Sequence, residues 1–200
     1  MNISPTTCGY TMHKDTAALY WSLLTINEGN VLDLGSGMGG FSLAKPERVK
    51  LYGIERDLVV SSKSLDYERI VTMEIGHEKI PFKDSMFSAV LARDILEHIE
   101  RPWLVVDELY RVMQKGGIFI CSVPKPDPKI VWSDYTHIRG FTSGAIRSLV
   151  ENSGFEVLDL FLMSGYTVAA KLGISRYLPI IGKIPVIRNL FDSYHCIARK

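Results

Sequence analysis

The sequence predicts an α/β protein built on a doubly wound, mostly parallel sheet of about seven strands, with helices on both faces. Strand-like and helix-like segments alternate from residue 30 to about residue 163. The first apolar run ends in an acid and then breaks into a loop that contains Gly35, Gly37, Gly39 and Gly40. Such alternation requires crossover connections, which favour parallel strands, and ligands of these sheets bind beyond the carboxyl ends of the strands.

Short apolar runs bounded by turn residues predict the strands. They are expected at residues 30–34, 51–55, 70–74, 87–92, 117–123, 155–163 and 194–199. Helices are predicted at 57–67, 101–113 and 142–153. The second helix has an apolar stripe at helical spacing, and Lys115-Gly116-Gly117 is a typical end signal for it. Thr142 is a typical N-cap for the third helix, and Gly154 is its stop.

The length of 200 residues suits one domain that spans 1–200. Residues 1–22 precede the first strand, and we expect a helix there that caps the ligand site. Residues 164–192 form an insertion between the last two strands, in which Lys171, Arg176, Lys183 and Arg188 stand among large apolar residues. Prolines and glycines in this insertion favour a lid of short helices or turns over one continuous helix.

Composition excludes some classes of protein. The net charge of +1 gives no electrostatic argument for a nucleic-acid partner. The three cysteines are far apart, so we expect no metal site and interpret Cys121 and Cys196 as buried free thiols. The first residues have no signal-peptide pattern, and no apolar run is long enough to span a bilayer, so the expected location is the cytoplasm.

The glycine-rich loop favours a nucleotide-type cofactor, because glycine lets a ligand lie against the backbone. Gly35 to Gly40 also fit the G-x-G-x-x-G pattern of nicotinamide-dependent oxidoreductases, which is one alternative. Glu55, at the end of the second strand, has the spacing of an acid that binds ribose hydroxyls in either class. Asp33 discriminates between them, because a carboxylate beside the loop would repel a pyrophosphate and attract an ammonium or sulfonium group.

The ordered motifs resemble those of class I S-adenosylmethionine-dependent methyltransferases with a Rossmann-like fold, in the subgroup that acts on small molecules. The resemblance begins with Val31-Leu32-Asp33-Leu34-Gly35-Ser36-Gly37-Met38-Gly39 and continues through Glu55. It includes the segments 80–87, 94–99, 109–117, 134–142 and 152–157. It therefore covers about two thirds of the chain, and it implies that the last strand runs antiparallel.

The resemblance also implies the roles of individual residues toward S-adenosyl-L-methionine. Gly35, Ser36 and Gly37 would hold its methionine part with Asp33 near the ammonium, and Asp94 would line the same side of the cleft. Glu55, with the adjacent Arg56, would bind the ribose. The family's acid for the adenine falls on Gly76, so His77, Glu78 or a backbone group would have to replace it.

Methyl transfer requires an aligned nucleophile and, for some acceptors, a base. His137 is the candidate catalytic base, and ordering of its loop is the alternative role. The expected acceptor is a small or lipid-linked molecule, methylated on O, N or C. The insertion could receive it, contact a membrane peripherally, or pack on its own domain or a second subunit. A cofactor-binding protein of the same fold without catalysis is a further alternative.

Overall fold

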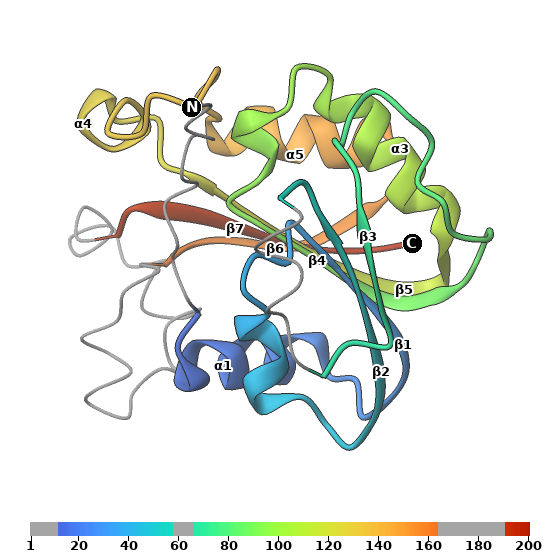
Figure 1. The fold of residues 1–200 in the computed structure, drawn as a ribbon. Helices are drawn as coiled ribbons and strands as arrows, with labels where there is room; N and C mark the ends of the chain where they lie inside the picture. Colours follow the sequence, from blue (N-terminus) through green and yellow to red (C-terminus); the bar gives the residue numbers. More distant parts are fainter. Residues whose placement is uncertain (1–11, 58–65, 164–190) are drawn as a thin grey trace, which may run out of the picture.

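The computed structural model describes residues 12–57, 66–163 and 191–200. Within them, seven strands form one sheet in the order β3-β2-β1-β4-β5-β7-β6 (Figure 1). Neighbouring strands are parallel, except that β7 is antiparallel to both β5 and β6. The predicted fold, with its antiparallel last strand, is confirmed. The strands are β1 (Glu28–Leu34), β2 (Arg48–Glu55), β3 (Arg69–Thr72), β4 (Phe87–Arg93), β5 (Met113–Pro124), β6 (Glu156–Met163) and β7 (Ser193–Arg199).

Helices cover both faces of the sheet (Figure 1). The helix α1 (Lys14–Leu24) and the short 3-10 helix η1 (Gly40–Ala44) lie on one face. The helices α3 (Pro102–Val112) and α5 (Ser143–Asn152) lie on the other. A second 3-10 turn, η2 (Leu96–His98), follows β4, and α4 (Pro128–Val131) follows β5. The two layers form separate apolar cores, as expected for a sheet buried on both sides.

The order of the strands creates the crevice in which such sheets bind ligands. β1 pairs with β2 on one side and with β4 on the other, so the chain leaves β1 and β4 in opposite directions. The loops that follow these two strands separate at the carboxyl edge of the sheet. The glycine loop after β1 and the segment after β4 therefore face each other there.

The helix predicted at 142–153 is confirmed with its caps. The hydroxyl of Thr142 accepts a hydrogen bond of 3.1 Å from the amide of Ala145, and α5 begins at the next residue. Gly154 follows the helix with a φ of 96°. The predicted helix at 57–67 falls largely on residues outside those described. At its end Asp66 has a φ of 64° and Tyr67 lies in no helix, so a helix does not reach Tyr67.

The boundary between α3 and β5 differs from the prediction. The helix ends at Val112, and β5 begins at Met113, four residues before the strand expected at 117. Between the pairs Phe87 with Met113 and Ala89 with Ile118, β4 advances by two residues and β5 by five. The lysine and two glycines predicted to end the helix form this bulge instead, where Gly116 has a φ of 81°. β3 is also shorter than the strand predicted at 70–74.

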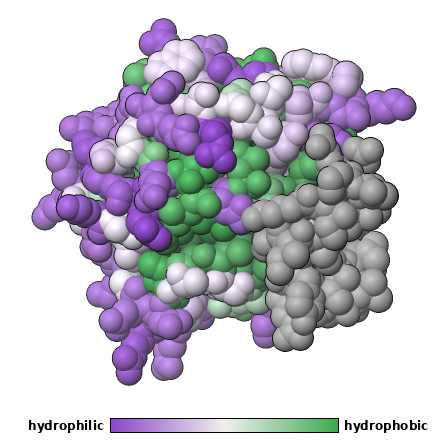
Figure 2. Space-filling view, turned by 180° about the vertical axis from the view of Figure 1, so that it is seen from behind, coloured by the Kyte–Doolittle hydropathy of each residue, from purple (hydrophilic) through white to green (hydrophobic). Residues whose placement is uncertain are grey.

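The rear of the molecule, where β6 is the edge strand, exposes hydrophobic residues between two more polar regions (Figure 2). Leu158 on β6 is 40% exposed, and Ile118 and Ile197 on neighbouring strands are half-buried. In the described part of the chain, every helix is too short or too polar to cross a bilayer. The insertion predicted at 164–192 lies outside the described residues except for Phe191 and Asp192.

Candidate active site

The loop after β1 turns on glycines at the crevice. Gly35 and Gly37 have φ angles of 75° and 51°, which side chains with a Cβ rarely adopt. The amides of Gly35 and Ser36 donate hydrogen bonds of 2.8 and 3.0 Å to the carbonyl of Ile54, which fastens the loop to β2. A Cβ on Gly35 would stand 3.0 Å from the side chain of Ile95, so the loop also touches the segment after β4.

Glu55 ends β2 with its carboxylate surrounded by backbone donors. Its Oε2 accepts a hydrogen bond of 2.8 Å from the amide of Gly37. Its Oε1 accepts bonds of 2.8 and 3.0 Å from the amides of Arg56 and Asp57. The residue is 9% exposed, and the side chain of Arg56 points to solvent. The carboxylate is thus held beside the glycine loop, while Arg56 contributes its amide.

Asp33 lies two residues before the loop and is 4% exposed. The hydroxyl of Tyr67 donates a hydrogen bond of 2.6 Å to its Oδ2. Burial raises the pKa of Asp33 to about 6, while Tyr67 and the charge of Arg93 act in the opposite direction. Burial, together with the neighbouring carboxylate, raises the pKa of Tyr67, so its hydroxyl remains a donor. Near pH 7 Asp33 is therefore a desolvated anion with one strong donor.

These residues line a pocket at the carboxyl edge of β1. It is bounded by Met12, Asp33, Gly35, Ser36, Gly37, Met38, Gly40, Phe41 and Arg93. A Cβ on Gly40 would stand 2.7 Å from Met12, so the residues just before α1 cover one end of the glycine loop. Acidic and basic side chains thus face one small space.

The predicted N-terminal helix corresponds to α1, which extends to Leu24. Its Trp21 stacks on Phe41 with ring centroids 4.2 Å apart and donates to the Phe41 carbonyl at 2.9 Å. Tyr20 is buried and hydrogen-bonds to His195 on β7 at 2.8 Å. These contacts fix α1 against the pocket wall formed by η1.

Asp94 follows β4 in a strained conformation. Its φ of 49° is rare for a residue with a side chain. Its amide donates to the carbonyl and hydroxyl of Ser122, and the Ser122 hydroxyl donates to Asp94 Oδ1 at 2.8 Å. Arg93 lies 3.9 Å from the other carboxylate oxygen. The network turns the chain sharply and directs the following residues across the crevice.

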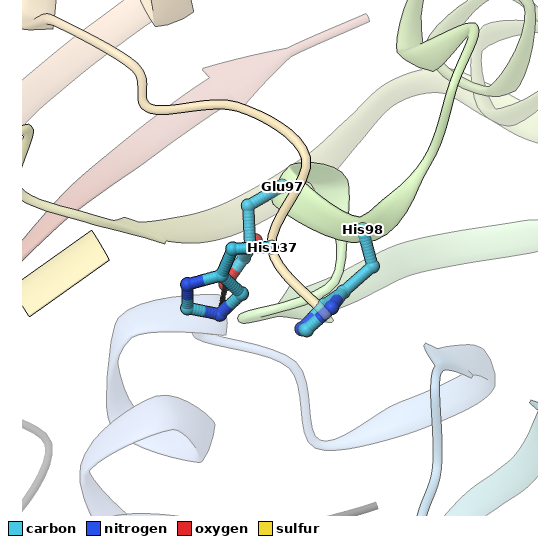
Figure 3. A group of neighbouring side chains, drawn as sticks. All are labelled: Glu97, His98 and His137. Atoms are coloured by element: carbon cyan, nitrogen blue, oxygen red, sulfur yellow. Dashed lines mark ion pairs between the residues drawn. The ribbon is translucent and has the colours of Figure 1, made fainter. Parts of the chain in front are cut away.

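A second polar cluster stands after β4, where Glu97, His98 and His137 converge (Figure 3). Glu97 is fully buried, and both its carboxylate oxygens have no hydrogen-bond partner among the described residues. The Nε2 atom of His137 lies 3.8 Å from Glu97 Oε1. Burial and the nearby Asp94 raise the pKa of Glu97 well above its usual range. Burial and His137 lower the pKa of His98.

The loop that carries His137 is fixed by local hydrogen bonds. Asp134 Oδ1 accepts hydrogen bonds from the amide and hydroxyl of Thr136, at 2.8 and 2.6 Å. The amide of Ile138 donates to the carbonyl of Glu97 at 3.1 Å. The Nδ1 atom of His137 bonds the carbonyl of Val131, and 9% of its side chain is exposed. Sequence reasoning placed His137 at the crevice, and the structure adds its contact with Glu97.

His77 and Glu78, the candidates for the adenine contact, are exposed in a turn between β3 and β4. An isolated bridge joins Ile75 and Glu78 there. A Cβ on Gly76, the position of the family's acid, would stand 2.9 Å from the side chain of Ile99. Gly76 thus lies close to the segment after β4, and its φ of 103° disfavours any residue with a side chain at this position. The adenine contact stays a prediction.

Three residues of the site were missed by sequence reasoning. Tyr67 is distant in sequence from Asp33, and only the pairing of β3 with β2 brings them together. Arg93 ends β4, where the alternation of strand residues could have indicated a side chain at the crevice. Glu97 was interpreted as part of a motif, because a buried unpaired carboxylate has no signature in sequence.

Comparisons with known proteins agree with this geometry. The family described as "Methyltransferase domain" matches residues 13–160. A probable S-adenosylmethionine-dependent methyltransferase of Mycolicibacterium smegmatis is 27% identical over 139 residues, which cover 65% of this chain and 53% of that protein. The match thus spans about half of this curated relative.

Solved structures share the fold at low sequence identity. A SAM-dependent methyltransferase from Archaeoglobus fulgidus is 18% identical, with a TM-score of 0.71 over 93% of this chain and 92% of that one. The [4+2]-cyclase SpnF is also 18% identical, with a TM-score of 0.68 over 94% and 81% of the two chains.

The chain therefore belongs to the methyltransferase domain family and has the fold of class I S-adenosylmethionine-dependent methyltransferases. The resemblance drawn from its motifs is confirmed, and with it the family's cofactor, S-adenosylmethionine. The match decides against the nicotinamide-dependent oxidoreductase.

Proposed function

We propose that this protein binds S-adenosyl-L-methionine in the pocket beside the glycine loop and transfers its methyl group to a small or lipid-linked acceptor. The observation that carries the proposal is the placement of Asp33 and Arg93 on one pocket wall with Gly35 and Gly37. An anion and a cation a short distance apart complement the ammonium and carboxylate of an amino acid. The positive φ angles of the glycines leave the backbone open to contact.

The residues present fit this cofactor. Asp33 is desolvated, which strengthens its attraction for an ammonium group. Glu55 is held by three backbone amides beside the glycine loop, and its Oε2, which accepts only one of these bonds, retains a lone pair for a ribose hydroxyl. We assign Arg93 as the donor to the carboxylate of the cofactor's methionine part. When bound, S-adenosylmethionine supplies an activated methyl group on its sulfonium.

The acceptor would lie between the glycine loop and the cluster after β4. We assign to His137 the role of the base that removes a proton from an acidic acceptor. The proton would go to Nε2, because Nδ1 contacts the backbone carbonyl of Val131. The Nε2 lone pair faces Glu97, so a proton taken up there would be shared with a buried carboxylate. The exposed side chains of Trp132 and Tyr135, 59% and 81% accessible, stand in the same loop and are available to an apolar acceptor.

The proposed acceptor class derives from the insertion. The prediction of a lipid-linked acceptor and peripheral membrane contact depends on residues 164–192, which lie outside the described residues except at their end. The rear of the sheet exposes hydrophobic residues as well (Figure 2). They make an apolar acceptor a reasonable first choice for testing.

A second candidate function is a cofactor-dependent reaction without methyl transfer. The observation that favours it is the fold shared with a protein described as a [4+2]-cyclase. Fold alone does not decide between these chemistries. The methyl-transfer proposal is preferred because the sequence similarity to a probable methyltransferase covers 65% of this chain.

Two measurements test the proposal. Calorimetry should show binding of S-adenosylhomocysteine and much weaker binding of NADH. Incubation with methyl-labelled S-adenosylmethionine and a panel of phenols, amines, quinols and lipid extracts should transfer label to one class. Tight NADH binding without S-adenosylhomocysteine binding would contradict the cofactor assignment. Cofactor binding without transfer to any acceptor would favour the cyclase-like or non-catalytic alternative.

A further inference from the structure

We propose that Glu97, His98 and His137 form a binding site for a divalent first-row metal ion such as Zn²⁺. One donor atom from each side chain lies within 4.8 Å of the other two (Figure 3). Two imidazoles and one carboxylate are a donor set that suits zinc and its neighbours in the row. The site differs from the expectation of no metal, which considered only the spacing of the cysteines, because His137 lies 39 residues beyond His98 in the sequence.

The hydrogen bonds of both histidines leave a nitrogen lone pair for a metal. In His137 a carbonyl, that of Val131, accepts from Nδ1, so Nδ1 carries the proton and Nε2 has the lone pair. In His98 the Nδ1 atom faces the carbonyl and the hydroxyl of Thr136, at 3.3 and 3.0 Å. That hydroxyl donates to Asp134, so it can only accept from His98. Metal-binding histidines typically donate their second N–H in this way.

Glu97 supplies the anionic ligand. Its side chain is 1% exposed, and both oxygens lack a hydrogen-bond partner among the described residues. A buried carboxyl group without partners costs free energy, which a cation bound to it would offset. Asp94 and Asp134 add negative charge nearby, with Arg93 as the opposing cation. The local field therefore favours a cation.

The three donor atoms lie farther apart than donors around a bound metal ion. Rotation of the side chains can remove the difference. Ligand bonds of about 2.1 Å in a tetrahedron place donors about 3.4 Å apart. Glu97 Oε1 and His137 Nε2 are 3.8 Å apart, and the widest separation in the cluster is below 4.8 Å. The backbone bond between Ile138 and Glu97 already ties the two loops together. Three ligands would leave a coordination position for water or an acceptor oxygen.

The role of the metal, unlike its binding, rests on the proposed methyltransferase function. A metal ion lowers the pKa of a bound hydroxyl group. At this site it would favour loss of the proton from an acceptor oxygen, and His137 would then act as a ligand in place of a base.

Calorimetric titration of the chelator-treated full chain with Zn²⁺ tests the site directly. We expect one ion per chain, and a Glu97→Gln variant should bind it at least about tenfold more weakly, the lower limit for loss of an outer partner alone. His98→Gln should weaken binding similarly. Glu100→Gln, an exposed acid three residues from Glu97, is the matched control and should bind as the wild type does.

Binding of S-adenosylhomocysteine by each variant serves as the control for folding and for the cofactor pocket. Anomalous scattering from zinc-soaked crystals should place the ion between the three side chains. A wild-type chain that binds S-adenosylhomocysteine but no zinc would overturn the metal site and leave the proposed function standing. Zinc that binds equally to the Glu97→Gln variant, or lies elsewhere in the crystal, would overturn it as well.

Discussion

The amide of Gly37 donates a hydrogen bond of 2.8 Å to Glu55, so the residue assigned to the ribose also holds the loop assigned to the methionine part. Two further amides, from Arg56 and Asp57, converge on the same carboxylate. One side chain therefore organises two parts of the cofactor pocket. Its removal should affect both binding and the stability of the loop.

The first prediction concerns Glu55→Ala. We expect the affinity for S-adenosylhomocysteine to fall by about 1.5–3 kcal/mol, the range for a hydrogen bond to a charged group. The melting temperature should also fall, because three backbone donors lose their acceptor. Calorimetry and thermal melts measure both effects, with the exposed Glu68→Ala as a control. An unchanged dissociation constant would reduce Glu55 to a structural residue.

Arg93→Gln separates recognition of the carboxylate from recognition of the nucleoside. Binding of S-adenosylhomocysteine should weaken by about 1.5–3 kcal/mol, because one charged contact is lost. Binding of 5′-methylthioadenosine, which lacks the amino-acid part, should change little. Isothermal titration with both ligands measures the difference. Equal losses for the two ligands would show that Arg93 acts on the shape of the pocket instead.

Asp33→Asn should stabilise the folded chain and weaken cofactor binding. The pKa of Asp33 is about 6 in the folded chain, above its ordinary value, so its favourable contribution to folding is present below pH 4 and is lost as the pH rises through 6. Above pH 6 the free energy of unfolding of the variant should therefore exceed that of the wild type by up to about 3 kcal/mol. The same change should weaken binding of S-adenosylhomocysteine.

Denaturant unfolding at pH 4 and pH 8 measures this stability difference. The gain should be large at pH 8 and small at pH 4. A variant less stable than the wild type at both values would mean that the hydrogen bond from Tyr67 requires the charge.

His195 predicts sensitivity to acid. Burial lowers its pKa to about 4, so the folded chain resists a proton that the unfolded chain accepts near pH 6.5. The neutral ring makes its whole contribution to the free energy of unfolding above pH 6.5. As the pH falls toward 4, this contribution is lost, which lowers the free energy of unfolding by up to about 3 kcal/mol. His195→Gln, which can still accept from Tyr20, should flatten this dependence. Exposed His77→Gln should leave it as in the wild type.

Much of the fold was predictable because its strands are continuous apolar runs. Residues 31–34 of β1 and 89–92 of β4 are buried on both faces, and these runs can be recognised as strands without knowledge of their partners. The junction of α3 and β5 was not predictable, because Gly116 and Gly117 fit a helix stop as well as a strand bulge. Only the pairing with β4 decides between them.

The candidate site divides in a similar way. Asp33 and Glu55 stand at strand ends with fixed spacing from the glycine loop, so sequence could indicate them. Tyr67 and Glu97 gain their roles from neighbours brought by the fold. Such neighbours depend on loop geometry, which short-range patterns do not encode.

The pairing of β6 with β7 leads to a prediction about the insertion. Met163 and Ser193 are direct partners at the ends of these antiparallel strands. A tight turn can join such a pair. Replacement of residues 164–192 by a short glycine-containing turn should therefore retain the fold and binding of S-adenosylhomocysteine. Acceptor turnover should be lost if the insertion shapes the acceptor site, whereas unchanged turnover would contradict that role.

The pairing of Met163 with Ser193 also affects which segments can stand between β6 and β7 in related proteins. Because both ends of the insertion are anchored one strand spacing apart, the loop-closure part of its free-energy cost grows only with the logarithm of its length. Doubling a flexible connection costs about 0.6 kcal/mol. Segments of very different size and chemistry can therefore be exchanged at this point, while the sheet and its cofactor crevice stay under separate constraint.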